Sequence, residues 1–364
     1  MVQPIYEYVF SGLVIVIMVT ASLSTIFPIT LAHLSQTNSL QLQGNARNIL
    51  DKLLLTPGDP YNWGTDLSIN STQSDGLRDF GLAGSLSFNT LYRLDPSKVE
   101  RLINTSTIDN PFYIPPERVA EIMGIEKDFG FSLSLEPVLQ ISDHILNKTI
   151  VTRITTPETI PVANVNVTAV LIRLNSLNEE EFEIATSSTD WNGTAVLDFS
   201  SADNFQSVAY IILTDYYDIR TRTVGGSNVT KAVLIGNNIV VKYPNGTNLE
   251  EAIGSSRSPL YAVGNRTYIG EFESSSASIS AYQLDNGGKT FVIYPLSNAD
   301  PDISLATFIT DIGGETKLVA AFRPFPTTYE TGPPAGSTRY TLTRLVEVAG
   351  VSMRVNFHIW RLSE

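Results

Sequence analysis

The chain has 364 residues, of which 24 are basic and 37 acidic, and it contains no cysteine. This length allows two or three domains with separate cores, and the lack of cysteine excludes disulfides and thiolate metal sites. The net charge of -13 argues against nucleic acid as a partner, because phosphate binding needs a cationic surface.

The first predicted element is a membrane-spanning helix over residues 9–32. These 24 residues carry no charge, and at about 1.5 Å per residue they cross a hydrocarbon core of about 30 Å. A cleavable secretory signal is the alternative, with Ser22-Leu23-Ser24 as its cleavage site. However, the apolar stretch exceeds the roughly 7–15 residues of a signal core, and no basic residue precedes it. We therefore expect a retained anchor that contacts membrane lipid through residues 9–32.

An amphipathic helix is predicted to continue from the span. Its apolar residues recur at helical spacing and mark one face: Leu42, Ala46, Ile49, Leu50, Leu53 and Leu54. The segment 56–60 (Thr-Pro-Gly-Asp-Pro) ends this helix, because proline lacks the backbone donor and glycine accepts the left-handed cap. Residues 1–55 are thus predicted to form one transmembrane and stalk helix.

A small α/β module is predicted over residues 56–146. In the segment 94–102, Asp95 is placed to cap a short helix. A second helix is expected over 115–124, starting at proline and ending at glycine. The segment 129–135 alternates apolar and polar residues, which is typical of a half-buried strand.

Short strands separated by turns dominate residues 147–226. The turn Thr189-Asp190-Trp191-Asn192-Gly193-Thr194-Ala195 contains an Asn-Gly hairpin signal. It resembles a turn of immunoglobulin-like modules in bacterial and archaeal surface proteins. The resemblance implies an immunoglobulin-like β-sandwich, for which the segment has a suitable size.

A second β-rich domain is predicted over residues 227–364. Its expected strands are 232–235, 239–243, 268–273, 290–294, 305–309, 318–322, 339–348 and 351–361. Ala349-Gly350 separates the last two strands as a tight hairpin turn. The fold class expected for the chain is therefore mainly β, with a long N-terminal transmembrane helix.

The sequence contains several candidate sites for N-glycosylation. Eight asparagines fit Asn-x-Ser/Thr: Asn70, Asn104, Asn147, Asn166, Asn192, Asn228, Asn245 and Asn265. All follow the predicted span, which favours an ectodomain outside the cell. Arg47 and Lys52 alone favour the opposite orientation, because basic residues tend to stay on the cytoplasmic side.

The span and three further segments together resemble an archaeal family of single-span, pilin-like surface proteins. These segments are 53–64, 91–102 and 355–361. The resemblance implies a membrane-tethered cell-surface protein and brings no catalytic residues with it. The chain departs from archaeal prepilins because residues 1–8 contain no basic residue ahead of the apolar stretch.

No catalytic, cofactor-binding or metal-binding residues are predicted. His33, His144 and His358 do not have the spacing of metal ligands, and no nucleophile elbow or phosphate-binding glycine motif occurs. The acidic segments 215–218 and 300–302 contain oxygen ligands suited to Ca²⁺, but turn capping is the favoured interpretation.

The leading hypothesis is a non-enzymatic, membrane-anchored structural or adhesive protein of the archaeal envelope. Other envelope proteins or like subunits are its expected partners. One alternative is a minor pilin-like subunit of a filament. The other is a tethered solute-binding or sensory ectodomain.

Overall fold

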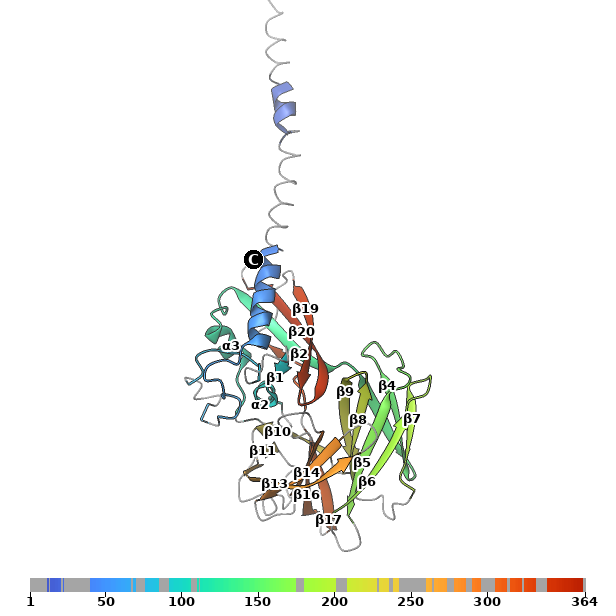
Figure 1. The fold of residues 1–364 in the computed structure, drawn as a ribbon. Helices are drawn as coiled ribbons and strands as arrows, with labels where there is room; N and C mark the ends of the chain where they lie inside the picture. The colour runs from blue at the N-terminus through green and yellow to red at the C-terminus, as the bar shows by residue number, and fades with distance from the viewer. Residues whose placement is uncertain are drawn as a thin grey trace, which may run out of the picture. The chain divides into compact units, whose positions relative to one another are not determined.

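The computed structural model describes residues 12, 14–20, 22, 40–66, 68–69, 76–84, 92–105, 110, 112–174, 180–200, 208–227, 229–235, 238–241, 260–263, 265–273, 278–285, 290–295, 305–312, 315–322, 324–331 and 339–362. The chain forms two compact units, Met1–Ile49 and Leu50–Glu364. The structure is mainly β, with several separate sheets (Figure 1).

The first unit contains helical residues at 12, 14–20, 22 and from 40 onward. The predicted span of residues 9–32 otherwise lies outside the described residues. In the part of the chain that is described, no helix combines the length and the apolar character needed to cross a membrane.

The predicted amphipathic helix is confirmed over residues 40–55. All six side chains of its predicted apolar face are at most 9% exposed. The helix ends where expected: the Thr56 hydroxyl donates to the carbonyl of Lys52 at 2.8 Å, and Gly58 adopts a φ of +78°. The proline and glycine signals therefore identified this boundary correctly.

A five-stranded sheet in the second unit has the order β1-β19-β20-β2-β18. Its strands are β1 (Arg93–Leu94), β2 (Phe129–Pro137), β18 (Tyr329–Glu330), β19 (Tyr340–Val348) and β20 (Val351–Arg361). The hairpin of β19 and β20 turns at Ala349 and Gly350, as predicted, with φ values of 51° and 71°. Strand β2 pairs with β20 along its whole length, so the predicted α/β module and the C-terminal region share one sheet.

Two short helices precede β2, close to their predicted positions. They are α2 (Pro96–Glu100) and α3 (Pro116–Ile122). The carboxylate of Asp95 caps α2 by accepting from the backbone N–H groups of Ser97 and Lys98. Gly124 follows α3 with a φ of +67°, the left-handed conformation that ends many helices.

A three-stranded and a four-stranded sheet pack face to face. The first has the order β3-β4-β7 and the second β6-β5-β8-β9. Their strands are β3 (Gln140–Leu146), β4 (Thr149–Thr155), β5 (Asn166–Leu174), β6 (Glu180–Ser188), β7 (Thr194–Asp198), β8 (Val208–Tyr216) and β9 (Ile219–Gly226). Ile150, Leu197, Leu171 and Ile212 belong to the shared core and are 0% exposed. Apolar side chains that alternate along each strand thus fill the space between the sheets.

The opposite face of the four-stranded sheet is also buried. Val170, Ile172 and Ile211 are 0% exposed and form a second cluster with Val229 and Phe322 packed against it. Val229 and Phe322 both come from the eight-stranded sheet, of order β12-β11-β10-β17-β16-β15-β14-β13. This double burial explains the continuous apolar run of β8, which has no polar outer face.

The eight-stranded sheet contains the remaining strands. They are β10 (Val229–Ile235), β11 (Asn238–Val241), β12 (Leu260–Val263), β13 (Asn265–Glu273), β14 (Ser278–Asp285), β15 (Thr290–Pro295), β16 (Leu305–Ile312) and β17 (Glu315–Phe322). The sequence prediction missed β12 and β14. The boundaries predicted at 55, 146 and 226 stay a prediction, although sheet pairing joins segments on both sides of 146 and of 226.

Candidate functional site

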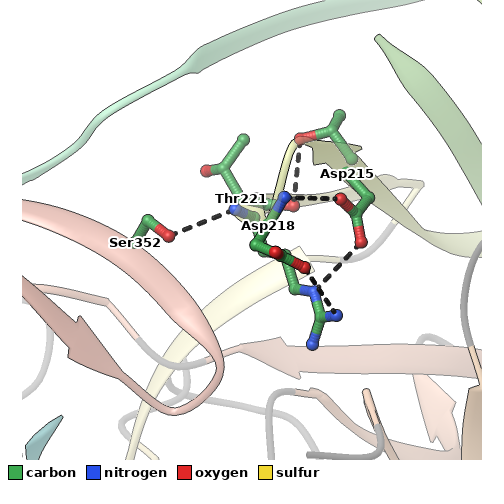
Figure 2. A network of polar contacts seen from close by, with 6 residues as sticks. Asp215, Asp218, Thr221 and Ser352 are labelled. Carbon is green, nitrogen blue, oxygen red and sulfur yellow. Dashed lines mark hydrogen bonds and ion pairs between the residues drawn. The ribbon is translucent and has the colours of Figure 1, made fainter. Parts of the chain in front are cut away.

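The acidic segment 215–218 forms the tight turn between β8 and β9 (Figure 2). Tyr217 and Asp218 both have positive φ, at 50° and 67°, as a two-residue type I′ turn requires. One oxygen of Asp215 accepts from the backbone N–H of Asp218 at 3.3 Å, and the other lies 3.1 Å from Nε of Arg220. The Asp215 carboxylate therefore caps the turn and pairs with a cation.

The second acidic segment that suggested calcium, 300–302, lies outside the described residues. Among the residues that are described, no group of three or more His, Asp or Glu side chains is arranged to hold a metal ion. His358 lies on β20 with Nδ1 2.8 Å from the hydroxyl of Thr341, and His144 lies exposed on β3. His33 is not among the described residues.

Strand β9, which follows this turn, contacts the β19–β20 hairpin. The backbone N–H of Arg220 donates to the hydroxyl of Ser352 at 3.2 Å, as Figure 2 shows. The guanidinium of Arg222 donates to the carbonyl of Ala349 at 2.7 Å. Two hydrogen bonds thus attach the four-stranded sheet to the β19–β20 hairpin.

Arg354 on β20 joins this hairpin to the connection between β4 and β5. Its Nε lies 2.8 Å from Glu136 on β2, and its Nη1 lies 2.8 Å from Glu158 in the connection between β4 and β5. These bonds lower the pKa of the Glu158 carboxyl and raise that of the Arg354 guanidinium. Because Glu158 is exposed, the ion pair contributes little to the free energy of unfolding. Its main effect is on how the sheets are oriented.

Strand register places two turns at one end of the paired sheets. Asn166 at the start of β5 pairs with Ser188 near the end of β6 and with Asp215 near the end of β8. The turns after β6 and β8 therefore lie at this end. Each presents an exposed aromatic ring: Trp191 is 81% exposed and Tyr217 is 86% exposed.

The turn that carries Trp191 is held by side chains that precede it. One oxygen of Asp190 accepts from the backbone N–H groups of Asn192 and Thr194, both at 2.9 Å. The Thr189 hydroxyl donates to the carbonyl of Val162 at 2.8 Å. Gly193 has a φ of +74°, which glycine adopts without strain.

A tight turn is present in the segment 189–195, with Trp191 and Asn192 at its centre, but the hairpin that Asn192-Gly193 indicated is wrong. Strands β6 and β7 on either side belong to different sheets, so the turn crosses between layers. The local sequence specifies the turn geometry, whereas the pairing partners of the flanking strands depend on distant residues.

Four of the eight candidate glycosylation sites are described with their side chains, and all four are exposed: Asn104, Asn147, Asn166 and Asn192. Asn265 lies on β13, and its side chain is outside the described residues. Asn70, Asn228 and Asn245 are not described. Exposure of the four sites is a requirement for their modification, which stays a prediction.

Two buried cations near the end of the helix at residues 40–55 were not predicted. Lys98 is 1% exposed and donates to the carbonyls of Pro57 and Ala83, both at 2.8 Å. Arg101 is 0% exposed and donates to the carbonyl of Ile69 at 2.9 Å. Burial lowers the pKa of Lys98 to about 8 and that of Arg101 to about 10.

These cations hold loops together. Pro57 also accepts from the indole N–H of Trp63 at 3.1 Å, so two donors converge on one carbonyl. Both cations lie 5.9 Å from the Trp63 ring centre, within range of a cation–π interaction. The sequence predicted a short helix in this segment, capped by Asp95, but gave no signal for a buried lysine.

No protein-family model matches the chain, and no curated protein matches it.

Proposed function

We propose that this chain is a non-enzymatic, membrane-anchored protein of the cell envelope, with a structural or adhesive ectodomain outside the cell. One observation carries the proposal. Six consecutive apolar side chains in the helical residues 14–19 are between 38% and 66% exposed. Water is a poor environment for such a continuous apolar surface, and hydrocarbon is a good one.

The polar side chains beside this segment also suit a lipid environment. The hydroxyl of Thr20 donates to the carbonyl of Val16, and that of Ser22 donates to the carbonyl of Met18 at 2.7 Å. Hydroxyls that bond to the preceding helical turn need no water partner. Residues 9–32 are the proposed span.

The outward orientation is supported by the asparagines. The four described glycosylation candidates lie in the second unit and are exposed. Modification of any of them requires export, because the lumen or exterior is where N-glycans are attached. Arg47 and Lys52 follow the span, so the proposed orientation opposes the usual distribution of basic residues.

The strand order supports the immunoglobulin-like interpretation. If β3 to β9 are lettered A to G, the two sheets read A-B-E and D-C-F-G. An immunoglobulin constant domain has A-B-E-D and C-F-G, so only the fourth strand differs in its sheet. Sandwiches of this kind occur in many cell-surface proteins, which agrees with the proposed ectodomain and the archaeal, pilin-like resemblance.

Membrane fractionation of the full chain tests the proposal. We expect the protein in the membrane pellet after alkaline extraction and expect Ile17→Lys to reduce the retained fraction. A lysine near the centre of a span costs about 2.5–3.5 kcal/mol of insertion free energy. Ile160→Lys is the matched control, since Ile160 and Ile17 are 60% and 57% exposed. A full chain found freely soluble in the cytosol would refute the anchor.

Assembly into a filament is the alternative that the pilin-like resemblance supports. A fully apolar helix surface at residues 14–19 suits a bundle of identical helices as well as lipid. Sedimentation of detergent-solubilised protein separates the two: a single anchored protein remains small, whereas a filament sediments rapidly. The mass of the mature N-terminal peptide reports whether a leader has been removed.

A further inference from the structure

Trp191 is exceptional among the tryptophans of this chain. The sequence contains three, and Trp63 and Trp360 are 0% exposed, whereas Trp191 is 81% exposed. A large aromatic ring in water forgoes the free energy that burial would provide. The ring therefore has a surface available for a ligand that lies beside it.

The neighbouring residue is a glycosylation candidate in a fixed conformation. Trp191 and Asn192 are the central residues of a turn in which the N–H of Gly193 donates to the carbonyl of Asp190 at 2.9 Å. The Asp190 carboxylate holds the backbone on both sides of Gly193. The exposed Asn192 side chain thus leaves a rigid turn at the position that follows the exposed Trp191 in the chain.

We propose that Asn192 carries an N-linked glycan whose first sugar packs on the face of Trp191. This inference rests on the proposed function, because only an exported ectodomain meets the enzymes that attach N-glycans. The C–H face of a pyranose ring is apolar and suits an aromatic face. Because the turn is already ordered, little conformational entropy is lost when the sugar packs.

The attachment requires a polyprenyl-phosphate-linked or pyrophosphate-linked sugar and a transferase. The amide nitrogen of Asn192 attacks the anomeric carbon, and an N–C bond forms there. The C–O bond to the phosphate breaks, and the lipid phosphate leaves with the bonding electron pair. The nitrogen loses one proton to a base of the transferase, so charge and atoms balance.

Other asparagines provide an internal comparison. Of the eight candidates, only Asn192 directly follows an aromatic residue. Asn147 is also exposed in a turn, but Leu146 and Lys148 flank it. A glycan at Asn147 therefore has no adjacent ring to cover, and this site serves as the matched control.

Tryptophan fluorescence gives a specific measurement, because Trp191 is the one exposed tryptophan of the three. The full chain is purified from its native cells in detergent, and acrylamide quenching is compared for wild type, Asn192→Gln and Asn147→Gln. We expect Asn192→Gln to lose the shielding of Trp191 and to be quenched as strongly as unglycosylated protein. Asn147→Gln should retain the shielding.

A second measurement uses thermal unfolding of the same proteins. Asn192→Gln should lower the Tm in the wild-type background and leave it unchanged in a Trp191→Ala background, because the packing surface is then absent. Equal quenching of wild type and Asn192→Gln, despite a glycan at Asn192, would overturn the packing.

Peptide mass spectrometry separates this inference from the proposed function. An unmodified Asn192 beside a modified Asn104, Asn147 or Asn166 would overturn the inference and leave export intact. If none of these sites carries a glycan, the inference about Asn192 is overturned as well. Membrane fractionation then decides separately whether the proposed membrane anchor is refuted.

Discussion

The side-chain amine of Lys98 lies 2.8 Å from the backbone carbonyl of Pro57, which precedes it by 41 residues. It lies equally close to the carbonyl of Ala83. This single buried cation on α2 therefore joins the segment after the helix at residues 40–55 to the loop that contains Ala83. Its removal takes one donor from each of these carbonyls, and the Pro57 carbonyl keeps the indole N–H of Trp63.

Lys98→Met is expected to destabilise the protein by about 1–3 kcal/mol, the usual cost of a buried polar group that loses its partner. Chemical denaturation followed by tryptophan fluorescence measures the change, because all three tryptophans lie in the second unit. Lys127→Met is the control, because Lys127 is exposed. Equal stability of the two variants would show that the Lys98 contacts contribute nothing net.

The same lysine predicts a pH dependence. Burial lowers its folded-state pKa to about 8, below the ordinary value of 10.5, so the unfolded chain holds the proton more tightly. The protonated amine therefore destabilises the fold fully below pH 8, and this penalty is lost as the pH rises toward 10.5. We expect the stability of wild type relative to Lys98→Met to increase between pH 7 and pH 9.5. A difference in stability between the two proteins that stays constant from pH 7 to pH 9.5 would contradict the lowered pKa of Lys98.

Asp190→Ala is expected to destabilise the turn between β6 and β7. The substitution removes the acceptor for two backbone N–H groups, and each such bond contributes about 0.5–1.5 kcal/mol. Hydrogen exchange at Asn192 and Thr194 should accelerate locally. Asp128→Ala, at an exposed aspartate, should leave both amides unchanged.

Gly130→Ala is expected to destabilise the five-stranded sheet by about 1–3 kcal/mol through overpacking. A Cβ at Gly130 would overlap the indole of Trp360, the residue that pairs with Gly130 on the neighbouring strand β20. Gly44→Ala is the contrasting change: Gly44 lies exposed in a helix with open space around it. That variant should gain about 0.5–1 kcal/mol of stability. In thermal unfolding, Gly130→Ala should have a lower Tm than wild type, and Gly44→Ala should have a higher one.

Tyr217→Asn is expected to stabilise the turn between β8 and β9. Tyr217 has a φ of 50°, a conformation that costs an ordinary residue about 1–2 kcal/mol and that asparagine tolerates. Tyr61→Asn is the control, since Tyr61 is 70% exposed and does not have positive φ. A lower Tm for Tyr217→Asn would mean that the contact of its ring with Tyr216 outweighs the backbone strain.

Local patterns predicted local structure well. The apolar spacing of the helix at residues 40–55, the Asp95 cap of α2 and the Ala349-Gly350 turn all depend on residues within a few positions of one another. The apolar positions of strand β14 change phase between Ala281 and Tyr282, so the strand lacks the regular alternation by which strands are predicted.

Long-range relationships were not readable in the same way. Nothing in residues 129–137 indicates that their partner lies at 351–361, because strand alternation records which face is buried and not which strand is adjacent. The buried Lys98 was missed for a related reason: its two acceptors are backbone carbonyls, which every sequence supplies. The exposed end with Trp191 and Tyr217 also required the strand register, since the sequence does not show that their turns are neighbours.

The pairing of β2 with β20 has a consequence for biosynthesis. During translation or export, β2 emerges more than two hundred residues ahead of the strand that will cover its edge. Until then its backbone donors and acceptors are available to other chains, a hazard for aggregation. Completion of this sheet is therefore necessarily a late event in maturation. A chaperone, or tethering that keeps nascent copies apart, would have its greatest effect in that interval.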